Sequence, residues 1–236
     1  MSTLIPGAVQ TKNDYPTTDG RPMAETDHHR DLMVELIQTL QARYAADPLV
    51  YVSGNLLLFY EPGNRRRHVA PDVFVVKGVA KYERPNYLVW EEGKGPDFVI
   101  ELTSASTRKE DVEHKFALYR DVLRVQEYFL FDPLGDYLQP PLQGYRRRQG
   151  RYAPVRPVRG RLPSKVVGLH LERHGQDLRL FDPAAGRWLP TPLERIEQAE
   201  RARQEAERAR RETEAANERL RRELAELRRR LAREEE

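Results

Sequence analysis

The sequence contains no cysteine among its 236 residues. Disulfide bonds and thiolate metal sites are therefore excluded, and the composition suits a reducing cytoplasm, where we expect the protein to act. No apolar run approaches the roughly 20 residues that a helix needs to cross a bilayer, and the N-terminus lacks the apolar segment of a signal peptide. We therefore expect a cytoplasmic protein without a membrane partner.

A strong charge of one sign is also absent. The net charge is +3 and the isoelectric point is about 9.1. This mild excess of basic residues permits nucleic-acid binding without arguing strongly for it. At 27.5 kDa the chain can bury one sizeable core and still carry an appendage.

Three regions of different composition divide the chain. Residues 1–25 contain prolines and glycines without periodicity, which predicts an irregular N-terminal arm. Residues 26–190 alternate strand-like apolar runs with amphipathic helical patterns, which predicts an α/β (α+β) domain with a mixed β-sheet flanked by helices. Residues 191–236 are rich in Glu, Arg and Ala, and this composition predicts one long charged helix.

Within the middle region, apolar spacing predicts a helix that begins near Thr26 with Asp27 as its N-cap, and a second helix over Lys109–Val122. Apolar runs that end at turn residues predict one or two strands at Val50–Tyr60 and single strands at His68–Lys77, Asp97–Leu102 and Val125–Phe131, with shorter ones near Gly144–Ala153, Val166–Leu171 and Leu178–Phe181. The polar and aromatic stretch Lys81–Lys94 is predicted to be a loop or flap.

One predicted strand carries a charged residue in an apolar setting. Phe98–Leu102 is otherwise apolar, as expected of a strand buried on both faces, but it contains Glu101. A buried carboxylate is costly unless it has a partner. On the next helix, Lys115 lies beside an apolar stripe that includes Val112 and Tyr119. We therefore expect the Lys115 ammonium within about 5 Å of the Glu101 carboxylate, either as a structural salt bridge or as part of a catalytic site.

Three carboxylates are candidates for a partnership with Glu101: Asp72, Asp97 and Asp111. Asp97 lies on the same face of the same strand, but about 13 Å along it. Asp72 belongs to a different strand, and neighbouring strands lie only about 4.8 Å apart. If the two strands are neighbours, we expect the Asp72 and Glu101 carboxyl groups within about 8 Å, close enough to share a Mg²⁺ ion.

The order of these residues resembles the PD-(D/E)XK nuclease superfamily. Pro71-Asp72 is followed 29 residues later by Glu101, but the lysine that usually comes two residues after the acid is replaced by Thr103. The stretches PDVFVV, PDFVIELTSAST, EHKFALYR and VQEYFLFDP are similar to the Uma-type putative restriction endonuclease family, in which the lysine lies on the following helix. The resemblance covers roughly Thr26 to Phe181 and implies a restriction-endonuclease-like fold.

The resemblance also implies a site and a reaction. Asp72 and Glu101 match the metal-binding acids, the backbone carbonyl of Leu102 is a further ligand, and Lys115 matches the displaced lysine. Such a set implies an endodeoxyribonuclease that uses Mg²⁺ or Mn²⁺ to hydrolyse DNA phosphodiester bonds.

Other residues are candidates for supporting roles. His29 and Tyr119 occupy positions where the family also carries His and Tyr, and Asp97 is a peripheral candidate. Two arginine runs are candidates for contacts with DNA phosphates: Arg65, Arg66, Arg67, Arg146, Arg147 and Arg148. Each run is equally compatible with a solvated loop.

The tail contains a short heptad pattern. Four leucines alternate by four and three residues: Leu220, Leu224, Leu227 and Leu231. Asn217 then falls on an a position, and upstream Arg203 and Arg210 fall on a positions and weaken the seam. The pattern predicts a homo-oligomer, as a parallel dimer or larger, that associates through the last heptads. The alternative is a single solvated helix with i,i+4 ion pairs.

Two other functions are compatible with the sequence. A catalytically inactive nucleic-acid-binding protein would keep the nuclease fold and lose the metal, but the intact Asp72, Glu101 and Lys115 argue against it. A scaffold would act through its coiled coil, with the body as a passive head. Deletion of Leu193–Glu236 separates these functions, because nuclease activity should survive in the body alone.

Overall fold

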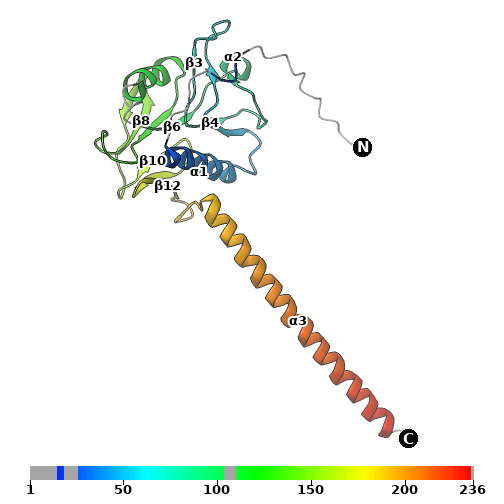
Figure 1. The fold of residues 1–236 in the computed structure, drawn as a ribbon. Helices are drawn as coiled ribbons and strands as arrows, with labels where there is room; N and C mark the ends of the chain where they lie inside the picture. The colour runs from blue at the N-terminus through cyan, green and yellow to red at the C-terminus, as the bar shows by residue number, and fades with distance from the viewer. Residues whose placement is uncertain (1–14, 19–25, 104–109, 235–236) are drawn as a thin grey trace. The chain divides into compact units, whose positions relative to one another are not determined.

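The computed structural model describes residues 15–18, 26–103 and 110–234. The chain divides into two compact units, Met1–Leu189 and Pro190–Glu236 (Figure 1). The first unit has mixed sheets flanked by helices, which confirms the predicted fold class, and the second consists of the helix α3 (Pro192–Glu234). Among the described helices, none is both long enough and apolar enough to cross a membrane.

A six-stranded mixed sheet forms the centre of the first unit. Its strands, in spatial order, are β1 (Val50–Ser53), β4 (Val73–Lys77), β6 (Phe98–Leu102), β7 (Glu127–Phe131), β8 (Leu142–Arg148) and β9 (Arg151–Pro154). The β6–β7 pair is parallel and the other pairs are antiparallel. Because β6 and β7 are buried along their whole length, they read as continuous apolar runs in the sequence.

One face of this sheet packs on α1 (Asp27–Arg43) and on a smaller antiparallel sheet. The smaller sheet contains β10 (Leu162–Pro163), β11 (His170–His174), β12 (Asp177–Asp182) and β13 (Arg187–Trp188). The helix buries Leu32, Leu36 and Leu40 in this core. The predicted cap was wrong by one residue: extended Thr26 is the N-cap, and its side chain accepts a hydrogen bond from the His29 amide at 3.2 Å.

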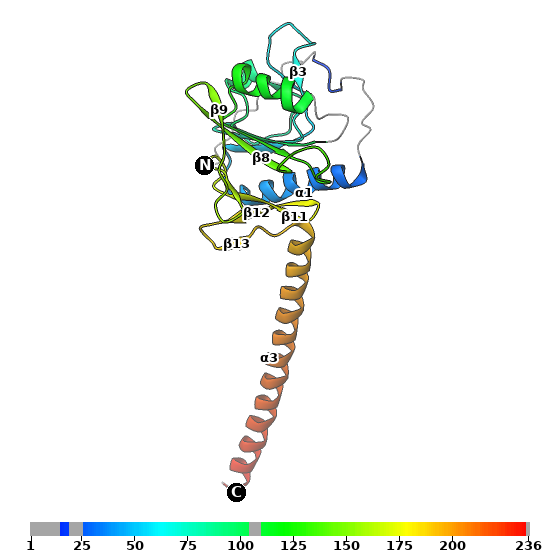
Figure 2. The same cartoon turned by 90° about the vertical axis from the view of Figure 1, so that its left-hand side faces the viewer.

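The other face packs on two π-helical segments, η1 (Glu110–Lys115) and η2 (Leu118–Val122). Figures 1 and 2 show these green helical turns on one side of the sheet and α1 on the other. The prediction of a helix here is confirmed in position, although its hydrogen bonding is wider than that of an α-helix. Val112 is exposed, so its predicted place on the inward stripe was wrong, whereas Tyr119 is fully buried.

Val50–Tyr60 contains two strands, β1 and β2 (Leu58–Phe59), in agreement with the prediction of one or two. His68–Lys77, predicted as one strand, is divided into β3 (His68–Val69) and β4. β2, β3 and β5 (Tyr87–Leu88) form a separate three-stranded sheet, so the predicted flap includes a strand, followed by the short helix α2 (Val89–Glu92). Gly54 permits the break after β1, because a Cβ atom there would lie 1.9 Å from the Asp72 carbonyl oxygen.

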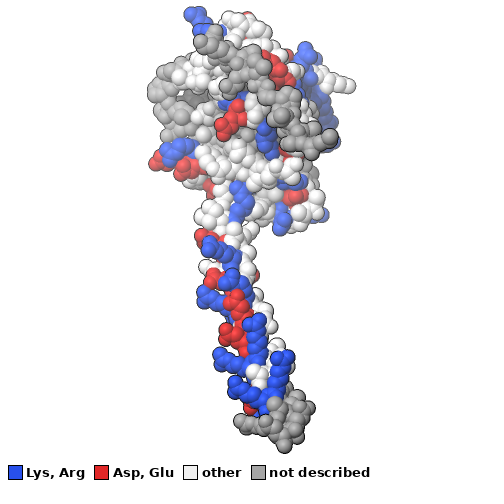
Figure 3. Space-filling view, turned by 90° about the vertical axis from the view of Figure 1, so that its right-hand side faces the viewer, with Lys and Arg blue, Asp and Glu red and all other residues white. Residues whose placement is uncertain are grey.

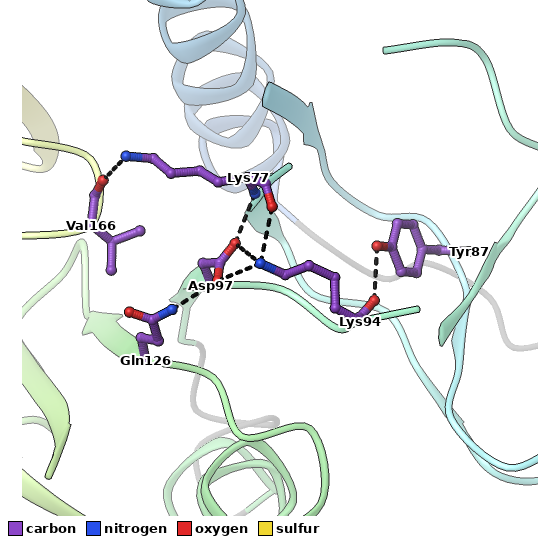
Figure 4. A network of polar contacts seen from close by, with 6 residues as sticks. All are labelled: Lys77, Tyr87, Lys94, Asp97, Gln126 and Val166. Carbon is purple, nitrogen blue, oxygen red and sulfur yellow. Dashed lines mark hydrogen bonds and ion pairs between the residues drawn. The ribbon is translucent and has the colours of Figure 1, made fainter. Parts of the chain in front are cut away.

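Asp97 anchors the N-terminal end of β6 (Figure 4). Its carboxylate accepts hydrogen bonds from the Lys77 amide at 2.7 Å and from the Gln126 side chain at 2.9 Å. The Lys94 ammonium contacts both carboxylate oxygens, at 2.9 and 2.8 Å. These contacts connect the ends of β4, β6 and β7. They satisfy the buried Asp97 carboxylate, so a structural role is enough to explain why it is buried.

A second buried carboxylate, Glu127, joins the central sheet to the segment before β11. Its oxygens accept from Arg146 Nε at 2.6 Å, from the backbone amides of Lys165 and Val166 at 3.0 and 3.2 Å, and from the Ser164 hydroxyl. The Arg146 guanidinium also donates to the Pro163 carbonyl at 2.7 Å. Arg146 therefore balances the charge of a buried carboxylate inside the body.

This network predicts a large loss of stability on removal of Arg146. Arg146→Ala leaves Glu127 buried without its counter-ion, so we expect the free energy of unfolding to fall by about 3–5 kcal/mol. Urea denaturation followed by circular dichroism measures the change. Arg148→Ala, on an exposed side chain of the same strand, is the matched control. Equal effects of the two substitutions would contradict the assignment.

Candidate active site

The candidate site lies where β4 begins and β6 ends. Val73 pairs with Ile100, so one step further along the same register Asp72 comes opposite Glu101. Opposed residues of an antiparallel pair lie on the same face of the sheet. The strands of Asp72 and Glu101 are neighbours, as predicted, whereas the approach of the two carboxyl groups to within about 8 Å stays a prediction.

Glu101 is fully buried, and both of its carboxylate oxygens accept hydrogen bonds. Lys115 Nζ donates to Oε2 at 2.9 Å, and the Tyr119 hydroxyl donates to Oε1 at 2.5 Å. The predicted proximity of Lys115 and Glu101 is therefore confirmed. Burial, followed by the neighbouring charge of Glu101, raises the pKa of Tyr119 well above its ordinary value, so this hydroxyl keeps its proton at neutral pH.

Lys115 and Tyr119 reach Glu101 from adjacent turns of the helical segment. Lys115 ends η1 and Tyr119 lies in η2, four residues later. A π-helix has more residues per turn than an α-helix, and such turns occur frequently at functional sites. The Lys115 side chain remains 14% exposed, whereas Glu101 has no exposed side-chain surface.

Asp72 is held by the backbone of the neighbouring strand. The Leu102 amide donates to Asp72 Oδ2 at 2.7 Å, and His29 Nε2 lies 3.7 Å from the same oxygen. Burial raises the pKa of Asp72, but the interactions with His29, Lys115 and the Leu102 amide outweigh burial and leave the pKa below its ordinary value. Asp72 is therefore ionised at neutral pH, with 14% of its side chain exposed.

These oxygen donors fit a hard divalent cation. Asp72 and Glu101 come opposite each other in the register of adjacent strands, and the N–H and C=O of a strand residue point to the same side, so the Leu102 carbonyl lies on the side of the Leu102 amide that contacts Asp72. Within the described residues, no group of three or more His, Cys, Asp or Glu side chains could hold a metal. Mg²⁺ does not require such a group, because it usually binds through one or two carboxylates together with water and substrate phosphates.

Thr103 is a part of the site that the sequence pattern left without a role. Strand alternation places it on the same face as Glu101, and its Oγ1 is buried without a hydrogen-bond partner among the described residues. The Tyr137 hydroxyl donates to the Thr103 carbonyl at 2.5 Å. Tyr137 comes from the turn after β7, and no spacing in the sequence indicates this long-range contact.

The remaining predicted residues lie in different environments. Asp97 belongs to the network at the opposite end of β6. Arg65, Arg66 and Arg67 lie exposed in the turn between β2 and β3. On β8, Arg146 pairs with Glu127, Arg147 donates to the Arg120 carbonyl at 3.0 Å, and Arg148 is exposed. The side chain of Asp111 lies outside the described residues.

Comparisons with known proteins place this site in a family context. A family model described as "Uma2: Putative restriction endonuclease" matches residues 9–174. The crystal structure of a putative nuclease belonging to DUF820, from Anabaena variabilis ATCC 29413, is similar with a TM-score of 0.47 and 17% sequence identity, over 68% of this chain and 87% of that chain. No curated protein matches the sequence.

Tyr119 donates one of the two hydrogen bonds to the Glu101 carboxylate, so its contribution to stability can be measured. Tyr119→Phe leaves one buried carboxylate oxygen without its donor, so we expect the free energy of unfolding to fall by about 1–3 kcal/mol. Urea denaturation of both proteins tests this value. Tyr82→Phe removes a hydroxyl that also donates to a glutamate, Glu92, but from an exposed ring, and it should change stability less. The assignment fails if the two variants are equally stable.

Proposed function

Because the chain belongs to the Uma2 family of putative restriction endonucleases, we propose that it is a metal-dependent endodeoxyribonuclease that hydrolyses DNA phosphodiester bonds. The proposed site consists of Asp72, Glu101 and Lys115, with Mg²⁺ or Mn²⁺ as the cofactor. One observation carries the proposal: an acid on each of two neighbouring strands is combined with a lysine whose ammonium lies 2.9 Å from the more buried acid.

In this proposal each residue has a distinct task. Asp72, Glu101 and the Leu102 carbonyl would hold the cation, which when bound polarises the scissile phosphate and lowers the pKa of water. Lys115 would orient the attacking water and balance the negative charge that develops on the phosphate. As the water oxygen bonds to phosphorus, the bond from phosphorus to the leaving oxygen breaks, and the products are a phosphate monoester and a hydroxyl end.

Tyr119 and Leu102 would act as positioning groups. The Tyr119 hydroxyl fixes one oxygen of Glu101, and the Leu102 amide fixes Oδ2 of Asp72. Residues held this way lose little conformational freedom when substrate binds, and such preorganisation is a large part of electrostatic catalysis. His29, 3.7 Å from Asp72, would help to keep that carboxylate ionised.

The proposal includes a departure from the usual PD-(D/E)XK arrangement. Thr103 occupies the position where the lysine usually lies, while Lys115 supplies the ammonium from the following helix. Lys115 brings its positive charge to Glu101 from the helical segment after β6 and not from β6 itself. The proposed chemistry requires only that Lys115 Nζ lie on the same side of Glu101 as Asp72. The influence of Lys115 on the pKa of Asp72 supports that placement.

The first test is DNA cleavage by a lysine variant. Lys115→Met keeps the aliphatic stem and removes the charge, so we expect the rate of Mg²⁺-dependent nicking of supercoiled DNA to fall by roughly 100-fold or more. Lys165→Met, on an exposed lysine of the same body, should cleave at the unaltered rate. Melting temperatures of both variants are measured alongside. A destabilised Lys115 variant that still cleaves normally would leave Lys115 as a structural ion-pair partner only.

A second test follows metal binding without catalysis. A cation that binds only the folded protein raises its melting temperature as its concentration increases. We expect Mg²⁺ or Mn²⁺ to produce this rise in the unmodified protein and not in Asp72→Asn. Asp97→Asn should lower the melting temperature in the absence of metal, because it breaks the network at the other end of β6, but should keep the metal-dependent rise. An undiminished rise in Asp72→Asn would refute the proposed ligand set.

A further inference from the structure

The last third of α3 has an apolar edge on a helix that is otherwise charged. Leu220 and Leu224 are 57% and 55% exposed. Leu227 and Leu231 continue the same spacing in the sequence. Apolar residues at alternating intervals of four and three residues form one line along a helix, and such a line is buried when two helices pair.

We propose that residues 217–231 of α3 pair with the same residues of a second copy of this chain, as a parallel and in-register two-stranded coiled coil. The leucines occupy the a and d positions, with Leu224 at a and Leu220 at d. This proposal concerns the second unit alone and does not depend on the nuclease activity of the first.

The flanking charges favour the parallel direction. In a parallel pair, a g residue faces the e residue five positions later on the partner helix. Glu223 occupies a g position and Arg228 the corresponding e position, so two opposite-charge contacts arise by symmetry. In an antiparallel pair centred on the leucines, e residues face each other and so do g residues, so Arg221 would meet Arg228 and Glu223 would meet Arg230. The repulsion of the two arginines then offsets the attraction between Glu223 and Arg230, whereas the parallel pair keeps its attraction without such a repulsion.

Asn217 adds a reason for one register. It occupies the a position one heptad before Leu224. In a parallel, in-register pair the two Asn217 side chains meet and can hydrogen-bond to each other, whereas any other register sets an amide against a leucine. A polar residue at a single a position specifies register and oligomeric state at some cost in stability.

The side chains of the rest of α3 favour exposure to solvent over pairing with another helix. Arg203 and Arg210 occupy a positions, where a charged residue opposes pairing. Ion pairs four residues apart run along the whole helix, as between Arg208 and Glu212 at 2.9 Å and between Arg219 and Glu223 at 3.0 Å. Figure 3 shows basic and acidic side chains alternating along the helix. Pairing is therefore confined to the last heptads. Since so short a seam gives modest affinity, we expect dimers whose fraction depends on protein concentration.

A parallel pair has a consequence for the assembly. Both helices begin at Pro192, directly after the first unit of each chain. Helices that run in the same direction tether the two bodies at the same end of the coil. Two copies of the proposed nuclease site would then be delivered to one DNA molecule together.

Disulfide trapping tests direction and register, because the natural chain contains no cysteine that could react. Asn217→Cys keeps all four leucines and brings two thiols together only in the parallel, in-register pair. In the antiparallel pair the same two residues would lie about 25 Å apart, given a rise of 1.5 Å per residue. The matched control is Arg222→Cys, which places the thiol on the outer face of the helix.

We expect the full-length Asn217→Cys protein to form a disulfide-linked dimer under mild oxidation at least tenfold faster than Arg222→Cys. Sedimentation of the unmodified chain should show a dimer that dissociates on dilution, and Leu224→Lys should sediment as a monomer at the same concentrations. Equal trapping of the two cysteine variants would overturn the parallel register. A chain that stays monomeric at every concentration would overturn self-association and leave the seam to a different protein.

Discussion

A buried carboxylate in the central sheet is the constraint on which the candidate site depends. Glu101 has no exposed side-chain surface, and an unpaired charge there would carry a large desolvation cost. Lys115 and Tyr119 resolve this cost by binding one carboxylate oxygen each. Since both come from the same helical segment, the interaction that satisfies Glu101 also fixes that segment over the end of β6. The hydrogen bonds of Glu101 therefore hold together the strand and the helical segment that form the site.

Three of the buried carboxylates of this body, Asp97, Glu101 and Glu127, differ in their neighbours. Asp97 and Glu127 are surrounded by donors from several elements, and each joins segments that are distant in the sequence. Glu101 instead comes opposite a second carboxylate, Asp72, in the register of β4 and β6. Two acids close together repel each other, so a protein retains such a pair at a structural cost. An incoming cation would relieve that repulsion, and this physical argument separates the candidate site from the structural carboxylates.

The sequence was sufficient for the parts of the fold that depend on local pattern. The apolar run Phe98–Leu102 predicted a buried strand, and helical phase predicted the approach of Lys115 to Glu101. Features that depend on distant neighbours were not predictable. Nothing near Arg146 indicates that Glu127 binds it, because the two are brought together by the pairing of β7 with β8. The break after β1 likewise depends on the approach of Gly54 to the backbone of Asp72.

Anomalous diffraction from crystals grown with Mn²⁺ would show whether one divalent cation binds between Asp72 and Glu101. We expect a single strong anomalous peak at this end of β6, with carboxylate oxygens of both residues at about 2.1–2.2 Å, slightly more than the distances of Mg²⁺. Lys115 Nζ would lie beside the peak and outside the coordination sphere. A map without a peak at saturating Mn²⁺, or with its peak remote from Asp72, would rule out this metal site.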